Sequence, residues 1–377
     1  MIYLDNAATT MRKPPGVIKA VKDAYNTFGG PGRGSHRAAM RAANAMYSCR
    51  EAACELFGVT SPEQVILCLN ATHALNTAIK SLAKPGRKVL VSGFEHNAVM
   101  RPLNTLTASG VEYEVVKSPL FNPRVTADSF KTALADKNVC LAVCTHVSNV
   151  FGCILPIDEI AKSCSEAGVP LIIDASQSSG ILPVRCDKLY GSIICTSGHK
   201  SLYGPQGTGL LIVPENITLK SLIEGGTGSG SLSLEMPGDL PDMLEAGTPN
   251  AWGAAGLCEG IKFVLREGVD NIMRHEHELM NLCAEHLYGI KGVKYYCFTS
   301  LQTGVMSMEF DNHDAEDVAA LLSERDIAVR AGLQCAPLAH KTAGTLPYGT
   351  LRVSFSSYTT HNEVKMFAKT LREVLSG

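Results

Sequence analysis

The stretch Ser192-Ile-Ile-Cys-Thr-Ser197-Gly-His-Lys200 joins a run of apolar and small residues to a lysine just after a glycine. Runs that are apolar throughout are typical of strands buried on both faces of a parallel sheet. Six further runs of this kind lie between residues 60 and 215: Gln64–Leu69, Lys88–Val91, Val111–Val116, Leu141–Thr145, Leu171–Asp174 and Leu210–Val213. The sequence therefore predicts a mostly parallel, seven-stranded sheet.

Helical patterns separate several of these runs, at Ala71–Ala83, Asn97–Ser109, Ala127–Ala135 and Ile157–Glu166. Alternating strands and helices are typical of an α/β fold, in which helices cover both faces of a parallel sheet. Segment 215–250 breaks the alternation, because it contains Gly225-Gly-Thr-Gly-Ser-Gly230 and several prolines. We predict that it is a long functional loop.

The C-terminal third alternates differently and predicts a smaller α+β domain. Its expected elements are a helical region over 252–288, strands at Val293–Phe298 and Val305–Phe310, a helix over Ala315–Glu324, strands at Ile327–Arg330 and Thr350–Ser356, and a last helix from Thr360. A chain of 377 residues is long for one simple core. We therefore expect a large domain over 15–255 and a small domain formed by 1–14 and 256–377.

Composition excludes several classes of partner. The net charge of −2 gives no electrostatic reason to expect binding to nucleic acid or to an anionic membrane. No apolar run approaches the roughly 18 residues of a membrane-spanning helix. The N-terminus also lacks the pattern of a signal peptide, so we expect a cytoplasmic protein.

The thirteen cysteines form no CxxC pair and no zinc-type spacing. Because the count is odd and no secretory signal is present, a disulfide framework is not expected. Most of them lie in apolar runs, as Cys68 does, where cysteine acts as a small hydrophobic residue. We therefore expect most of the thiols to be structural and no metal to be bound.

Polar residues at the ends of predicted strands indicate a cofactor site. Lys200 lies at such an end, where ligands of open α/β sheets bind, and a partly desolvated amine there can form a Schiff base. A lone lysine is more often a solvated surface residue. Asp174 ends another apolar run. It could instead cap a helix, and a role as a metal ligand is disfavoured because no second acid or histidine lies at a plausible ligand spacing in the sequence. Paired with Lys200, it is the acid expected to keep the pyridinium nitrogen of pyridoxal 5′-phosphate (PLP) protonated, and Gln177 is expected to contact the phenolate oxygen.

Two further elements fit the same cofactor. Ala71 and Thr72 begin a predicted helix, whose N-terminus can hold a phosphate; ordinary capping by Thr72 is the alternative. His96 follows the run Lys88–Val91 and can stack on an aromatic ring, although a structural role is the commoner fate of a lone histidine. The four elements lie at successive strand ends, in an order that suits one aromatic phosphate.

Several motifs together resemble the class V aminotransferase family of PLP enzymes, and within it the cysteine desulfurases and selenocysteine lyases. They cover nearly the whole chain: Tyr3-Leu-Asp-Asn-Ala-Ala-Thr-Thr10, Thr145-His-Val-Ser-Asn149-Val, Ser197-Gly-His-Lys200, Glu245-Ala-Gly-Thr248-Pro-Asn, Val329-Arg-Ala-Gly-Leu-Gln-Cys335-Ala and Leu351-Arg352-Val-Ser-Phe. The resemblance implies fold type I of the PLP-dependent transferases and a homodimer.

The resemblance also implies roles for individual residues. Lys200 is the Schiff-base lysine and the base that removes the Cα proton, and Cys335 is the nucleophile that becomes a persulfide. The cofactor contacts implied are Ala71, Thr72, His96, Asn149, Asp174, Gln177, Ser197 and His199, with Thr248 reaching the phosphate of the other subunit. Asn149 and Arg352 are expected to hold the substrate carboxylate, which the planar fork of arginine binds through two hydrogen bonds. His36 is expected at the mouth of the substrate site, a surface role being the alternative.

The activity that this resemblance implies first is conversion of L-cysteine to L-alanine, with sulfur left on Cys335. A selenocysteine lyase, a PLP aminotransferase or β-eliminating lyase without a persulfide, and a non-catalytic thiol-rich binding module are the alternatives. Gln334 departs from the pattern of the desulfurases with a short catalytic loop, in which histidine often precedes the cysteine. The loop Arg330–Cys335 is short, so a dedicated sulfur or selenium acceptor is expected to come to it.

Overall fold

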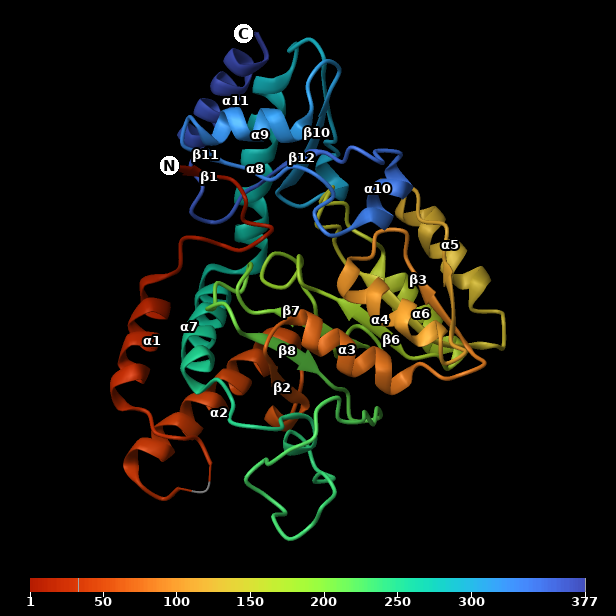
Figure 1. Cartoon of the computed structure of the whole chain (residues 1–377), viewed down its shortest axis with the longest axis vertical. Coiled ribbons are helices and arrows are strands. Elements are labelled where there is room, and N and C mark those ends of the chain that lie inside the picture. Colours follow the sequence, from red (N-terminus) through yellow and green to blue (C-terminus); the bar gives the residue numbers. More distant parts are fainter. Residues whose placement is uncertain (33, 377) are drawn as a thin grey trace.

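The computed structural model describes residues 1–32 and 34–376, and its larger part is built on one sheet of seven strands (Figure 1). The strands are β2 (Val65–Cys68), β3 (Lys88–Val91), β4 (Glu112–Val115), β5 (Val139–Thr145), β6 (Leu171–Asp174), β7 (Ile193–Ser197) and β8 (Gly209–Ile212). Their spatial order is β2-β8-β7-β6-β5-β3-β4, and only β8 runs antiparallel to its neighbours. The prediction of a mostly parallel, seven-stranded sheet is confirmed, and each predicted run overlaps one strand.

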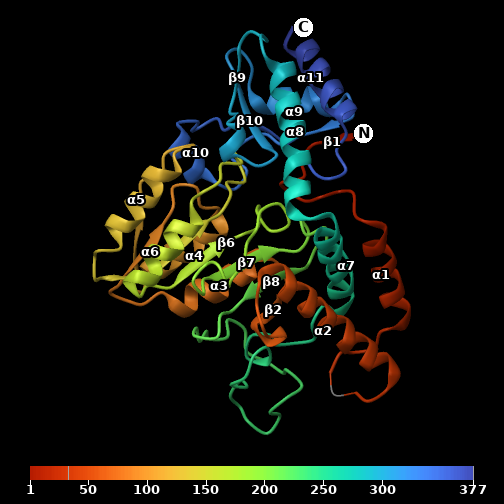
Figure 2. The same cartoon turned by 180° about the vertical axis from the view of Figure 1, so that it is seen from behind.

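Helices cover both faces of this sheet, as Figures 1 and 2 show from opposite sides. Successive residues of a strand point to opposite faces, so Leu90 packs into one apolar cluster while Val89 and Val91 pack into another. The second cluster lies under α3 (Ala71–Leu82) and α4 (Asn97–Thr107). The first lies under α2 (Arg37–Phe57), α5 (Pro123–Ala133), α6 (Ile157–Ala167) and α7 (Ala251–Glu267). The prediction that every strand is buried on both faces is wrong for β4, whose four residues are all exposed because it lies at the sheet edge.

Two long helices have no counterpart in the predicted pattern, and one predicted helical region is two helices. α1 (Pro15–Thr27) and α2 precede the first strand of the sheet, and both pack against α7. The predicted helical region over 252–288 is two helices, α7 and α8 (Val269–Leu287), separated by Gly268. Gly268 has φ +82, a conformation that glycine adopts at little cost, and this turn redirects the chain from the larger part to the smaller part.

The smaller part is an α+β unit, as predicted, with its own apolar core. An antiparallel sheet of order β12-β10-β9 packs with three helices, and β1 pairs in parallel with β11. The elements are β1 (Ile2–Tyr3), β9 (Val293–Tyr295), β10 (Val305–Phe310), α9 (Ala315–Ser323), β11 (Ile327–Ala328), β12 (Leu351–Ser354) and α11 (His361–Ser376). α7 packs against α1 and α2, and α8 packs against α11. The expected domain boundary at residue 255 stays a prediction.

Short elements complete the chain: 3-10 helices η1 (Pro62–Gln64), η2 (Asp242–Leu244) and η3 (Thr299–Leu301), and helix α10 (Pro337–Ala343), which lies between the two parts in Figure 1. Segment 215–250 holds no helix or strand except η2 and forms the long green loop at the bottom of Figure 1, as predicted. Among the described residues, no helix combines the length and apolar character that crossing a membrane requires.

Candidate active site

The strand ends that the sequence singled out surround one cavity of about 220 Å³. Parallel strands end at the same edge of a sheet, so residues that follow β3, β5, β6 and β7 meet there although they are far apart in the chain. Nine of the residues predicted for the site line this cavity: Ala71, Thr72, His96, Asn149, Asp174, Gln177, Ser197, His199 and Lys200.

Lys200 is held at the cavity by the backbone that leaves β7. Gly198 donates its N–H to the carbonyl of Thr208 (2.8 Å), and a Cβ at Gly198 would lie only 2.2 Å from the Thr208 hydroxyl. Only glycine allows this approach. On the other side, the Thr10 hydroxyl donates to the carbonyl of Lys200 (3.1 Å), which ties the N-terminal segment to the same turn.

The Lys200 amine lies in surroundings that disfavour its charged form. Removal from water lowers its pKa to about 8, although the carboxylate of Asp174 acts in the opposite direction. Arg352 and Cys335 act on it more weakly, the cation lowering and the thiolate raising the pKa. An amine of this kind carries a neutral fraction near neutral pH far larger than an ordinary lysine does, and it can act as a nucleophile or a base.

Asp174 ends β6 and is buried. Its Oδ1 accepts hydrogen bonds from the backbone N–H (3.0 Å) and the hydroxyl (2.5 Å) of Ser176. Among the described residues no donor reaches Oδ2, so that oxygen can receive a proton or a hydrogen bond from a ligand. Gln177 donates one N–H to the carbonyl of Ala7 (2.9 Å), which fixes its amide at the cavity wall.

The N-terminus of α3 opens into the same cavity. Asn70 caps this helix by accepting from the N–H of His73 (2.9 Å), so the alternative that Thr72 is the cap is wrong. The Thr72 hydroxyl and the first N–H groups of α3 are therefore available to an anion. His199 lies opposite, with Nδ1 3.0 Å from the hydroxyl of Thr9. Its pKa is lowered to about 4 by burial and by two lysines, so its imidazole is neutral.

His96 caps α4 from the cavity wall. Its Nδ1 accepts from the N–H of Ala98 (3.0 Å), so the proton of the neutral ring lies on Nε2. Burial and the nearby Lys200 charge lower its pKa, which keeps the ring neutral. The preceding Glu95 is buried and accepts from the N–H of Thr145 (2.8 Å), which joins the chain after β3 to the end of β5. Burial raises the pKa of Glu95 to about 8.

Arg352 is not in the cavity wall itself but contacts it through Asn149, since its Nη1 donates to the Asn149 carbonyl (2.7 Å). Its Nη2 pairs with Asp5 (2.7 Å), and its buried Nε has no partner among the described residues. Burial lowers the pKa of this guanidinium while Asp5 acts in the opposite direction. Asp5 also pairs with Arg330 (3.0 Å). Nothing in the spacing of residues 5, 330 and 352 predicts that they meet, so the sequence shows Asp5 only as part of a motif.

Cys335 is the only exposed cysteine of the thirteen, all of which are free and lie in the described part of the chain. Its carbonyl accepts from the N–H of Asn97 (2.9 Å), at the start of α4 and next to His96. The structure thus brings the Cys335 loop to the strand ends that carry Lys200. Within residues 1–32 and 34–376, no three His, Cys, Asp or Glu side chains gather in a way that could hold a metal ion.

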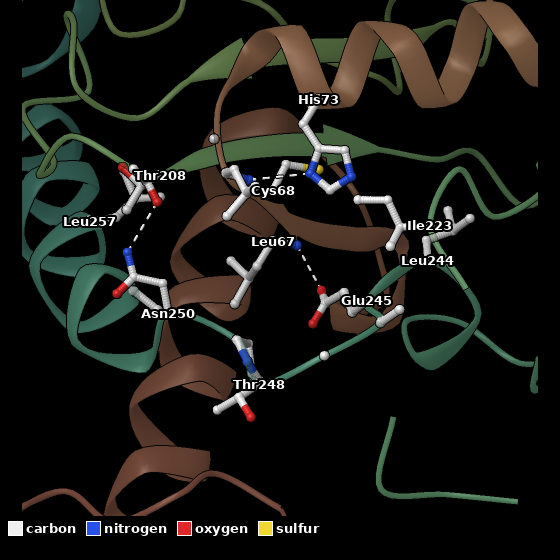
Figure 3. Close-up of a pocket in the computed structure, with 17 residues that line it drawn as sticks. Leu67, Cys68, His73, Thr208, Ile223, Leu244, Glu245, Thr248, Asn250 and Leu257 are labelled. Atoms are coloured by element: carbon white, nitrogen blue, oxygen red, sulfur yellow. Dashed lines mark hydrogen bonds between the residues drawn. The ribbon is translucent and has the colours of Figure 1, made fainter. Parts of the chain in front are cut away.

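Thr248 and His36 lie away from this cavity in the single chain. Thr248 is exposed beside a second hollow of about 200 Å³, shown in Figure 3. The segment is anchored by Glu245, which pairs with buried Arg50 (2.7 Å) and accepts from the N–H of Leu67 (2.7 Å). His36 is exposed and caps α2 by accepting from the N–H of Ala39 (3.3 Å). A role for Thr248 in another subunit and for His36 at the substrate mouth stay predictions.

Comparison with known proteins places this geometry in a family. The chain is 32% identical over 385 positions to a probable cysteine desulfurase of Xylella fastidiosa, covering 99% of this chain and 91% of that protein. It is 29% identical over 387 positions to a probable cysteine desulfurase of Mycolicibacterium paratuberculosis, but spans only 56% of that longer relative. The structure is similar to an apo cysteine desulfurase of Thermococcus onnurineus, with a TM-score of 0.93, 30% identity, and coverage of 100% of this chain and 95% of the other.

A family model described as Aminotransferase class-V matches residues 2–367. This match includes every residue that lines the cavity, as well as Cys335 and Arg352. Since the model covers almost the whole length, the chain belongs to the class V aminotransferase family.

Proposed function

We propose that this protein is a PLP-dependent cysteine desulfurase, which converts L-cysteine to L-alanine and leaves the sulfur on Cys335. The observation that carries the proposal is that Lys200 and Asp174 line one cavity, where removal from water lowers the pKa of the lysine to about 8. The desulfurase names of the relatives support the choice among the chemistries that such a cavity can serve.

The donor set of the cavity fits PLP. The free Oδ2 of Asp174 suits a protonated ring nitrogen, and the second N–H of Gln177 suits a phenolate oxygen. The N-terminus of α3, with Thr72, Ser197 and His199 around it, suits a phosphate. The neutral ring of His96 suits stacking on the pyridine. When bound, PLP withdraws electrons from the Cα of an amino acid attached through its amine.

The remaining chemistry belongs to residues of this chain. Arg352 and Asn149 hold the substrate carboxylate, for which the buried Nε of Arg352 is a free donor. Lys200 takes the Cα proton onto its neutral amine. The Cys335 thiolate attacks the substrate sulfur: a new S–S bond forms and the Cβ–S bond breaks. The electron pair of the broken bond stays on the substrate, which takes one proton at Cβ and regains the Cα proton from Lys200 before it leaves as alanine, and Cys335 keeps a persulfide.

The exposure of Cys335 decides how the sulfur can leave. The persulfide lies at the surface of a short loop, so an acceptor thiol or protein has to approach the loop. Such chemistry needs reduced thiols, which the cytosol maintains. A cytoplasmic location is therefore part of the proposal.

A homodimer is also part of the proposal. Thr248 is exposed and lies outside the Lys200 cavity of its own chain, which suits a residue that completes the phosphate site of a second copy. Sedimentation of the purified protein tests the dimer. Loss of cofactor retention in Thr248→Val, with wild-type mass, would support the contact across the interface.

A visible absorption scan tests the cofactor. A band from PLP linked to Lys200 is expected in the purified protein and is expected to be absent in Lys200→Ala. A colourless wild-type protein that does not take up PLP would contradict the proposal.

A parallel assay of alanine, sulfide and selenide from L-cysteine and L-selenocysteine tests the reaction. Alanine from cysteine, with persulfide sulfur on Cys335, supports a desulfurase. Release of selenide with no turnover of cysteine would establish a selenocysteine lyase instead. Turnover of cysteine that does not need Cys335 would exclude the persulfide step.

A further inference from the structure

The backbone around Cys335 has an uncommon conformation. Gln334 has φ +43 and Cys335 has φ +58, so two adjacent residues other than glycine lie in the left-handed region. Such a conformation is strained for a residue with a side chain, and it persists only where the surrounding structure holds it. The contacts that hold these two residues therefore decide where the Cys335 thiol lies.

Two hydrogen bonds hold the peptide groups on either side of Cys335. The side chain of Asn149 donates to the carbonyl of Gln334 (2.8 Å). The backbone N–H of Asn97 donates to the carbonyl of Cys335 (2.9 Å). Both donors belong to the larger part of the molecule, and Asn149 also lines the Lys200 cavity. These contacts fix the loop from the cavity side.

A separate set of contacts holds the loop through the Gln334 side chain, which is buried. Its Nε2 donates to the carbonyl of Thr350 (2.8 Å), beside β12. Its Oε1 lies 2.9 Å from Nε2 of His340 on α10, and Nδ1 of His340 lies 2.7 Å from the hydroxyl of Thr345. Among the described residues no hydrogen bond joins the Gln334 amide to the Cys335 thiol, so this side chain acts on the loop and not on the sulfur.

The protonation of this network is set by its own chemistry. The Oε1 of an amide only accepts, so Nε2 of His340 carries the proton and Nδ1 accepts from the hydroxyl of Thr345. His340 is fully buried, and burial lowers its pKa to about 4, so the ring is neutral. Every donor meets an acceptor. Hydrogen bonds that are all satisfied in a buried site stabilise the one arrangement that makes them, so this network opposes relaxation of the strained backbone.

We propose that Gln334 and His340 are positioning residues that hold Cys335 at a fixed place over the site. The catalytic consequence rests on the proposed desulfurase function. In this protein the residue before the cysteine does not exchange protons with the thiol; it fastens the loop to α10 and β12. The pair acts on the transfer of sulfur to Cys335 and leaves the binding of the substrate carboxylate, which depends on Arg352 and Asn149, unchanged.

Matched variants separate the hydrogen bonds from the volume of the side chains. Gln334→Met and His340→Phe keep the approximate shape and lose the bonds. His340→Gln keeps a donor for Gln334 and an acceptor for Thr345. Lys341→Ala, at an exposed position on the same helix, is the control. Thr345→Val removes only the outer bond and serves if His340→Phe does not fold.

The kinetic measurement is formation of alanine from L-cysteine by the PLP-loaded variants. We expect kcat to fall about tenfold or more in Gln334→Met and His340→Phe, because a misplaced nucleophile loses rate steeply. KM is expected to change less than about twofold, and the visible band to stay unchanged. His340→Gln is expected to restore most of kcat, and Thr345→Val to give a smaller loss.

A second measurement does not depend on activity. Hydrogen exchange of the peptide covering residues 330–339 is expected to be about tenfold faster in Gln334→Met and His340→Phe, and to match the wild type in His340→Gln and Lys341→Ala. Wild-type kcat and wild-type exchange in both disrupted variants would overturn the proposal. If the wild type forms no alanine but the two disrupted variants still exchange faster, the desulfurase function is overturned. The role of Gln334 and His340 in positioning Cys335 then stands.

Discussion

The Lys200 region and the Cys335 region differ in how the chain holds the reactive atom. Lys200 follows a central strand whose five residues are all buried, and its amine is removed from water. Cys335 is exposed, in a loop with positive φ angles held by side chains from α10 and from the larger part. In the proposed function, the sheet supplies the residues that would hold PLP and an amino acid, and a few polar contacts position the thiol that would take the sulfur.

The largest expected effect separates these two regions by mutation. Lys200→Ala is expected to lose at least about 10³-fold in alanine formation from both L-cysteine and L-selenocysteine, because the base is gone. Cys335→Ala is expected to lose cysteine turnover to a similar degree while it keeps the visible band and part of the selenocysteine turnover. Alanine assays and absorption spectra check both variants. Equal loss of both substrates in Cys335→Ala would remove the distinction between the regions.

Asp5 connects the two regions, because it pairs with Arg352 and with Arg330 of the Cys335 loop. Asp5→Asn keeps the shape of the side chain but weakens two charge-assisted contacts. A loss of about 1.4 kcal/mol in substrate binding corresponds to a tenfold lower affinity. We expect KM for L-cysteine to rise about tenfold with a smaller change in kcat. Asp187→Asn, which breaks an exposed pair with Arg185, is the control and is expected to change little. An unchanged KM in Asp5→Asn would show that Arg352 needs no such partner.

The pH dependence of cofactor loading tests the buried lysine. The Lys200 pKa is lowered to about 8, so its amine is mostly protonated below pH 8 and neutral above it. In protein freed of PLP, the rate at which the visible band appears is expected to rise about tenfold per pH unit below 8 and to level off above it. Asp174 raises this pKa, so Asp174→Asn is expected to shift the midpoint downward. A rate that still rises at pH 10 would indicate an ordinary, solvated lysine.

The smallest expected effect concerns stability where α8 enters the smaller part. Glu276 is buried, and burial raises its pKa from 4.5 to about 8. Because the folded pKa lies above the unfolded one, the contribution to stability is complete below pH 4.5 and is lost as the pH rises to about 8. Glu276→Gln is therefore expected to match the wild type near pH 4.5 and to melt about 2 °C higher at pH 8.5. Thermal melts across this range measure it, with exposed Glu278→Gln as the control. A variant that follows the wild-type curve would show that Glu276 does not titrate there.

Local patterns of sequence predicted the larger part of the fold well and some helices poorly. Apolar runs identified all seven strands of the large sheet, because strands buried on both faces have to be apolar along their length. The edge strand β4 is the exception, because Glu112 and Glu114 alternate with Tyr113 and Val115 and its four residues are exposed. The two helices over 252–288 were merged because both are periodic and a single glycine, Gly268, separates them.

The sequence by itself determined which residues gather at the strand ends, because the carboxyl ends of parallel strands meet at one edge of a sheet and the motifs mark the residues that follow them. Nine predicted residues, from Ala71 to Lys200, line one cavity. Only the tertiary structure decided that Asp5 lies between Arg330 and Arg352, and that the Gln334 amide meets His340. A hydrogen bond between side chains needs its two atoms to lie about 3 Å apart, and this depends on the backbone φ angles and on how the side chains are buried. Neither can be read from the identity of residues that lie far apart in the chain.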